Sequence, residues 1–425
     1  MIYLTRQIIH LYNKSILTSD KKIRSQQWWQ SFQFKDFRYL WVSTFFQSIG
    51  FGMDNVALGW IVFEKTDSAF MVGLAAALRM VPLFLLGVFS GLIADKVERR
   101  IFLRIFTIVG GGLMALLGVL LIIGYDQVWI IIAIATITGA TFAFVLTLRQ
   151  AYTFDIVGAS LSLNGLSMLQ IASQTGGVFG ALISGILISK LGAGPQFVVI
   201  GLMYLISFLV LFGASESGQA ASRRRESLNS NFKGYIDLIK EYPVLLILMC
   251  LASITEIFGF THMSLIPVFA KEVLSVGPIG LGILTAVRQV GGFLGLFSLT
   301  LLGNYNQKGK LMFYIVVFFG IGQIFLAFSS DVFLFAFFLL VVNACAMSVD
   351  TLYKTLMQQN VPNEQRGRAM GSWVLSIGTA PIGHLGIGGI ATAFGAPMAV
   401  LFNGVMLTAA GISTFIFLPK IRKLP

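Results

Sequence analysis

The sequence predicts an all-α membrane protein of twelve transmembrane helices, arranged as two pseudo-symmetric halves of six helices each. Hydrophobic residues make up 56% of the chain and charged residues only 11%, whereas charged residues are about 25% of a typical soluble domain. Apolar runs of about 20 residues, the length that crosses a hydrocarbon core, recur along the chain. Parts of the second half of the sequence also repeat parts of the first half.

Each of the twelve predicted helices is an apolar run that is long enough to span the bilayer. None alternates between apolar and polar residues, as the roughly 10-residue strands of a membrane barrel do. In chain order the predicted spans are 38–63, 69–93, 101–124, 128–149, 162–189, 195–214, 243–270, 279–303, 311–329, 331–356, 369–392 and 396–418.

The positive charges predict the orientation of these spans. The formal net charge is +12, which in a soluble chain would indicate nucleic-acid binding. Here the Lys and Arg residues cluster before the first span, after the even-numbered spans and at the C-terminus, whereas only Lys65, Lys190 and Lys271 lie in the other turns. Because cytoplasmic loops are enriched in Lys and Arg, we expect both termini in the cytoplasm and no nucleic-acid partner.

The turn between the second and third spans carries a charged motif. It reads Gly-Leu-Ile-Ala-Asp-Lys-Val-Glu-Arg-Arg, and its defining residues are Gly91, Asp95, Lys96, Arg99 and Arg100. With one apolar span before it and one after it, this motif resembles the signature of the major facilitator superfamily. The resemblance implies a conformational switch, in which the Asp95 carboxylate stabilises one state by facing the positive N-terminal end of the eleventh helix.

An internal duplication is visible within the sequence. An offset of 209 residues places Arg79 on Arg288 and Arg99 on Lys308, and an offset of 204 places Thr147 on Thr351. Parallel repeats with a ligand site at mid-membrane between them are the architecture of this superfamily. The predicted divisions are a tail over 1–36, a six-helix half over 37–214, a linker over 215–242, a six-helix half over 243–418 and a tail over 419–425.

Further motifs narrow the resemblance to exporters similar to the enterobactin exporter. They are Phe-Arg-Tyr-Leu-Trp at 37–41, Arg-Met-Val-Pro at 79–82, Leu-Arg-Gln-Ala at 148–151, Leu-Asn-Gly at 163–165 and Val-Pro-Asn-Glu-Gln-Arg-Gly-Arg at 361–368. This resemblance implies proton-coupled export of drugs or siderophores. Where such antiporters carry Gly-Pro in the fifth helix, this chain has Gly176 and Gly177. Small residues there and at 383–389 let helices approach closely and slide.

Charged residues inside the spans are the first candidates for function. Asp54 and Arg79 lie at similar depth in the first two spans, and Glu256 and Arg288 lie in the seventh and eighth; Arg149 closes the fourth. An unpaired charge at mid-membrane costs at least about 2.5–3.5 kcal/mol. In one interpretation Asp54 and Glu256 gain and lose protons during transport. In the other, each half holds a fixed ion pair that neutralises an arginine.

Histidines and aromatic residues supply further candidates. His262 and His384 lie inside spans, where imidazole can relay protons or serve as a hydrogen-bonded packing group. Trp60, Tyr353 and Trp373 are candidate walls of an amphiphilic substrate site. No His, Cys, Asp and Glu set has metal-site spacing, so we expect neither a metal nor a cofactor.

These observations predict a secondary active transporter, not an enzyme, in the bacterial inner membrane. It would move a small amphiphilic molecule, a siderophore or drug-like compound, outward in exchange for protons, and it would act as a monomer. No Gly-x-x-x-x-Gly-Lys-Ser/Thr run supports a nucleotide-driven pump. An importer or facilitator of the same fold, for instance for siderophore uptake, shares every feature above. A non-transporting sensor or scaffold is the other alternative, and the intramembrane charges argue against it.

Overall fold

The computed structural model describes residues 29–94, 97–215, 238–303, 305–362 and 365–424, and in these ranges all regular structure is helical. The first half of the chain forms the short helix η1 (Gln30–Gln33) and then α2 (Lys35–Thr66), α3 (Ala69–Ala94), α4 (Arg99–Ile122), α5 (Val128–Leu191), α6 (Ala193–Val210) and η2 (Leu211–Gly213). The second half forms α8 (Pro243–Phe258), η3 (Phe260–Leu265), α9 (Ile266–Val268), η4 (Phe269–Val273), α10 (Gly277–Leu302), α11 (Lys308–Ala327), α12 (Val332–Gln359), α13 (Arg366–Ile377), α14 (Ala380–Phe394), α15 (Ala396–Phe417) and α16 (Pro419–Arg422).

Eleven helical segments of the described chain are long and apolar enough to cross a membrane. They correspond to the second to twelfth predicted spans. The first predicted span falls within α2, whose 32 residues are long enough, but polar side chains such as Gln47, Asp54 and Asn55 lower its hydropathy. The all-helical membrane fold predicted from composition is confirmed.

The turn predicted between the fourth and fifth spans is almost absent. Helix α5 continues past Leu148 and bends only at Gly158, where φ is +73° and ψ is 172°. That backbone conformation is open to glycine and strained for other residues. The two arms of α5, 128–158 and 160–191, therefore extend well beyond the predicted limits at 149 and 162.

Two predicted spans of the second half are broken helices. The seventh is interrupted at Gly259, between α8 and η3, and the eleventh between α13 and α14, where Pro381 stands in the first turn of α14. The Gly259 carbonyl, freed by the break, accepts hydrogen bonds from Gln323 Nε2 at 2.9 Å and from His262 Nδ1 at 2.6 Å. Because these side chains satisfy the backbone group, the interruption is stable inside a bundle.

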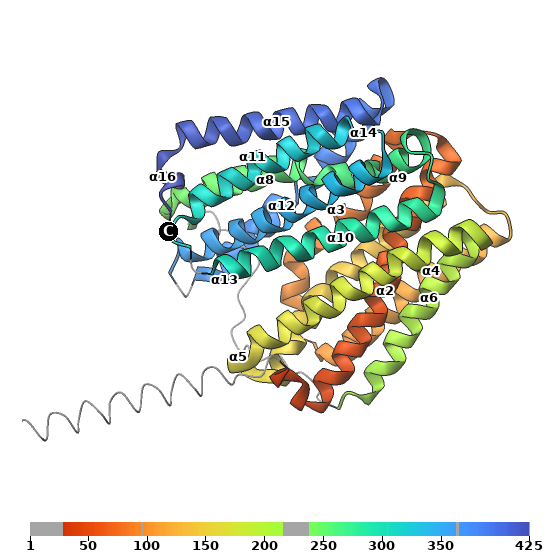
Figure 1. The fold of residues 1–425 in the computed structure, drawn as a ribbon. Helices are drawn as coiled ribbons and strands as arrows, with labels where there is room; N and C mark the ends of the chain where they lie inside the picture. The colour runs from red at the N-terminus through yellow and green to blue at the C-terminus, as the bar shows by residue number, and fades with distance from the viewer. Residues whose placement is uncertain (1–28, 95–96, 216–237, 304, 363–364, 425) are drawn as a thin grey trace, which may run out of the picture.

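The halves lie side by side, with α8 to α16 in green to blue and α2 to α6 in red to yellow-green (Figure 1). They meet mainly along α5 with α10 and along α3 with α14. We call one end of the molecule the basic end; it carries Lys35, Arg99, Lys308, Arg366 and Arg422. The opposite end, the far end, carries the turns at Asp67, Gly192, Ser275 and Gly395.

Hydrophobic packing joins the halves at the far end. One buried cluster combines residues of both halves, among them Phe63 and Val72 with Leu265, Leu281 and Ile387. Two other clusters lie toward the basic end, and each takes its buried residues from one half only. An ion pair between Asp67 and Lys271, with a distance of 2.6 Å, adds a polar link across the far end. The described conformation is therefore closed at the far end.

Glycines allow this closure. A Cβ on Gly73 of α3 would lie 2.3 Å from the carbonyl oxygen of His384 on α14. A similar clash would arise between α5 and α10, where a Cβ on Gly185 would lie 2.6 Å from the carbonyl oxygen of Pro278. Backbone atoms cannot rotate away as a side chain can, so a side chain at either glycine must push the halves apart.

We therefore expect Gly73→Ala to shift the protein toward a state that is open at the far end. Overpacking costs about 1–3 kcal/mol, and 1 kcal/mol already changes a two-state ratio about fivefold. Spin labels on Tyr125→Cys and Ser330→Cys, one in each half at the far end, report the separation by pulsed electron spectroscopy once Cys250 and Cys345 have been replaced by alanine. Gly386→Ala is the matched control, because a Cβ there meets nothing within 4 Å. An unchanged distance distribution in Gly73→Ala would refute this role.

Candidate substrate cavity

A cavity of about 310 Å³ lies between the halves, midway between the two ends. Helices α2, α3 and α5 line it from one side, and η3, α9, α10 and α14 line it from the other. Its polar lining residues are Asn55, Arg79, Ser264, Thr285, Arg288 and His384. The remaining lining is largely apolar and includes Phe51, Phe142 and Met80. Ligand sites of transporters with this fold lie at such an interface of repeats.

Asp54 and Arg79 form an ion pair at the edge of this cavity. Arg79 Nη2 lies 2.5 Å from Asp54 Oδ2, and Arg79 Nη1 donates to Asn55 Oδ1 at 3.3 Å. The guanidinium also lies over the Phe51 ring at 5.1 Å. Asp54 is 4% exposed and its Oδ1 has no partner. Adjacent helices thus bring together the two residues that the sequence placed at similar depth.

Arg288 differs from Arg79, because no described carboxylate oxygen lies within 4.0 Å of its guanidinium. Its Nη1 contacts the Met263 sulfur at 3.5 Å, which is a weak acceptor, and its buried Nε has no hydrogen-bond partner. The Glu256–Arg288 pair, predicted as the counterpart of the Asp54–Arg79 pair, is therefore not formed. Glu256 lies on α8, on the basic-end side of the break at Gly259, and faces a different cluster.

That cluster lies inside the second half, toward the basic end. Asp350 accepts hydrogen bonds from Lys354 Nζ at 2.7 Å and Trp373 Nε1 at 2.8 Å, and Lys354 lies 4.0 Å from the Trp373 ring centroid. Glu256 and Tyr353 line a small cavity beside them. The sequence had suggested that Tyr353 and Trp373 line the substrate cavity. They lie instead beside Glu256 and Asp350, outside the lining of the central cavity.

The two histidines have different environments. His262 is 1% exposed, bonds to the Gly259 carbonyl through Nδ1 and lies 3.4 Å from Asn343 Nδ2 through Nε2. Both ring nitrogens therefore have partners that hold the break in the helix. His384 lines the central cavity, and its Nδ1 lies 2.5 Å from Ser264 Oγ.

Arg149 is held inside the first half, away from the cavity lining. Its Nη2 donates a hydrogen bond to Gln47 Oε1 on α2. Tyr204 on α6 packs against Gly50 and Gly111 in the same half. Arg149 therefore links α5 to α2 within the first half.

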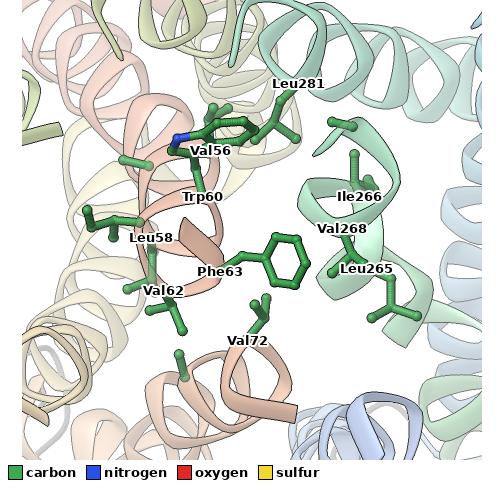
Figure 2. Close-up of a cluster of buried hydrophobic side chains, with 14 of the residues drawn as sticks. Val56, Leu58, Trp60, Val62, Phe63, Val72, Leu265, Ile266, Val268 and Leu281 are labelled. Atoms are coloured by element: carbon green, nitrogen blue, oxygen red, sulfur yellow. The ribbon is translucent and has the colours of Figure 1, made fainter. Parts of the chain in front are cut away.

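Trp60 belongs to the far-end seal. It is 7% exposed and packs in the cluster shared by both halves. Figure 2 shows Phe63 extending from α2 toward the segment that carries Leu265 and Val268, with Trp60 next to Leu281 of α10. The candidate wall residue predicted from sequence thus lies in the packing that closes the cavity on this side.

The charged motif is described only in part. Asp95 and Lys96 lie outside the described residues, and Gly91 is part of α3. Arg99 is 7% exposed and pairs with Asp155 on α5 at 2.6 Å. Arg100 donates to the Ser215 carbonyl at 2.6 Å and to Glu98 at 2.8 Å.

Sequence reasoning missed Asp155, Asp350 and several cavity residues. The two aspartates lie in the thirds of their helices nearest the basic end. In the sequence, a charged residue in such a position is expected to be solvent-exposed. Asn55 follows Asp54 directly and could have been found from that position. Phe142, Ser264 and Thr285 carry no such signal, because nothing in their local sequence marks the face they occupy.

A mid-depth cavity between two helical halves, lined by charged and apolar side chains, is typical of a membrane transporter. The profile described as transmembrane secretion effector matches residues 26–424. The chain is 24% identical over 366 residues to the staphyloferrin A transporter of Staphylococcus aureus (strain NCTC 8325 / PS 47), which covers 84% of this chain and 90% of that protein. It is also 24% identical over 383 residues to the multidrug efflux pump Tap of Mycolicibacterium fortuitum, which covers 88% and 93%.

Solved structures agree with the fold. The nucleoside transporter NupG superposes with a TM-score of 0.70 at 14% identity, over 89% of this chain and 99% of that one. The chain belongs to the transmembrane secretion effector family within the major facilitator superfamily. It is accordingly a multi-pass secondary transporter of small molecules and not an enzyme.

Proposed function

We propose that this protein exports a small amphiphilic molecule, a siderophore or drug-like compound, from the cytoplasm in exchange for protons. The observation that carries the proposal is the buried Asp54–Arg79 pair beside a cavity with largely apolar walls. Similarity to a staphyloferrin A transporter and to a multidrug efflux pump supports the substrate range. The carrier works as a monomer in the bacterial inner membrane and binds no nucleic acid.

The orientation follows from charge. The basic end faces the cytoplasm with both termini, since Lys and Arg favour that side. With the far end sealed around Phe63 and the Asp67–Lys271 pair, the described conformation then presents its cavity to the cytoplasm. The transport units are the two predicted halves, 37–214 and 243–418, which rock about the cavity while the linker 215–242 and the tails 1–36 and 419–425 remain in the cytoplasm.

Asp54 is the proton-coupling residue in this proposal. When Asp54 is ionised, it neutralises Arg79; when it takes up a proton, the ion pair is lost and Arg79 becomes available to other groups in the cavity. Arg79 is the ion-pair partner of Asp54, and Asn55 accepts a hydrogen bond from the same guanidinium. Glu256, His384 and His262 remain candidates for further proton steps, with His262 restricted by its two partners.

The direction of transport is tested in cells with labelled staphyloferrin A. For an exporter, deletion of the gene raises retention of the metal-free siderophore and sensitises cells to ethidium, and complementation reverses both. We expect a retention difference of about tenfold, the size of a 1.4 kcal/mol change in steady-state distribution. Loss of uptake of the iron-loaded siderophore, with unchanged retention and ethidium sensitivity, would instead establish the importer alternative.

A further inference from the structure

The charge balance of the central cavity is uneven. Two arginines line the cavity, Arg79 and Arg288, and no Asp or Glu is among its lining residues. Asp54 lies just behind Arg79 and neutralises it. Among the described residues Arg288 has no comparable partner, because its Nη1 contacts the thioether sulfur of Met263 and its Nε has no hydrogen-bond partner. Counting the described residues, the cavity therefore carries one positive charge without a paired carboxylate when Asp54 is ionised.

Such a charge is expensive within a membrane and is typical of a substrate pathway. A guanidinium presents its donors in a planar fork that matches a carboxylate better than any other common group. Arg288 also has hydroxyl groups nearby, since Thr285 lies one turn away on α10 and Ser264, next to Met263 in η3, lines the same side of the cavity beside His384. These groups can complete the hydrogen bonds of a bound anion.

Apart from Asn55 and Arg79, the first half lines the cavity with apolar side chains. Phe51, Leu58, Met80 and Phe142 contribute to the lining. A volume of about 310 Å³ accommodates a compact organic molecule. The cavity thus combines the Arg288 guanidinium with an apolar wall. A ligand that fits both parts is an amphiphilic anion.

We propose that the transported molecule is an amphiphilic carboxylate, whose anionic group binds Arg288 and whose apolar part lies against Phe51 and Phe142. This inference rests on the proposed transport function and specifies its substrate class. Arg79 is a second, conditional anion site: it joins the carboxylate when a proton on Asp54 breaks the Asp54–Arg79 pair. Substrates with two carboxylates then engage both halves of the protein at once.

The test uses three probes that share one fluorophore and differ in charge. Dansyl-L-glutamate is a dianion, its dimethyl ester is neutral, and dansylcadaverine is a cation. Binding to the full-length protein in detergent is followed by energy transfer from tryptophan to the dansyl group. We expect the dianion to bind about tenfold or more tightly than the ester, because charge-assisted hydrogen bonds form only with the anion.

Variants locate the anion site. Arg288→Gln should weaken dansyl-L-glutamate about tenfold and leave the ester unchanged, and Arg288→Lys should recover part of the loss. Arg149→Gln is the matched control, since it removes another buried positive charge that does not line the cavity, and it should leave the affinity within about twofold. Monodisperse elution of each variant shows that it is folded.

Two results would overturn the inference. One is wild-type binding of the ester or the cation as tight as that of the dianion, which needs no variant. The other is unchanged dianion affinity in Arg288→Gln. Failure of the export function appears elsewhere, as equal siderophore retention in deleted and complemented cells, so the two failures are distinguishable.

Discussion

Asp54→Asn should abolish substrate-driven proton movement while leaving substrate exchange in place. Asparagine keeps the size of the side chain and removes the group that can take up and release a proton. In proteoliposomes with the pH dye pyranine inside, external substrate should raise the internal pH for wild type, and the rate should fall about tenfold or more in the variant. A loss of this size is equivalent to about 1.4 kcal/mol or more.

The matched control is Glu64→Gln, which neutralises an exposed carboxylate near the far end of the same helix. It should keep proton movement close to the wild-type rate. Exchange of labelled substrate across the same vesicles shows whether each variant is folded and binds. Coupled proton flux that persists in Asp54→Asn would return Asp54 to the alternative of a fixed structural partner for Arg79.

Arg99→Gln should strongly destabilise the protein and reduce transport. The Arg99–Asp155 pair joins α4 to α5 with side chains that are 8% and 13% exposed, and breaking a buried pair by removing one partner costs about 3–5 kcal/mol. Thermal unfolding in detergent, followed by size-exclusion chromatography, should show a clear fall in midpoint. The double variant Arg99→Gln, Asp155→Asn should recover much of it, because the second change removes the buried negative charge that the Arg99 guanidinium had neutralised.

Lys65→Gln gives the comparison for this second prediction. Lys65 pairs with Asp126 at the far end, where the side chains are 37% and 47% exposed. Such exposed pairs contribute about 0–1 kcal/mol, so the midpoint should hardly move. If Arg99→Gln and Lys65→Gln shift the midpoint equally, the buried pair has no special role in stability.

The sequence predicted the helical membrane fold well because bilayer thickness sets a simple rule for length and hydropathy. It also placed Asp54 and Arg79 at similar depth, and the structure joins them at 2.5 Å. Depth can be read along the chain, since each residue advances a helix by about 1.5 Å.

The face of each helix could not be read in the same way. In a membrane both the lipid-facing and the packed faces of a helix are apolar, so hydrophobic periodicity carries little information. Trp60 was therefore assigned to the cavity although it lies in the seal, and Phe142 was overlooked although it lines the cavity. In soluble helices an apolar stripe would have decided both cases.

Helix interruptions and contacts between residues distant in the sequence also could not be predicted from the sequence. The break at Gly259 separates Glu256 from Arg288, so the symmetry that predicted their pairing does not hold. Its stability depends on Gln323, which is 64 residues away. Asp155 likewise finds Arg99 across 56 residues, and no local pattern reveals such a partner.

The central claim is that a proton gradient drives transport through the cavity between the halves. The most direct measurement uses proteoliposomes with purified wild-type protein, labelled staphyloferrin A outside and an acidic interior. Proton-coupled exchange predicts accumulation of the label above its external concentration, and collapse of that accumulation when an ionophore dissipates the gradient. Equilibration to equal concentrations, with the same rate whether the gradient is present or absent, would contradict the account.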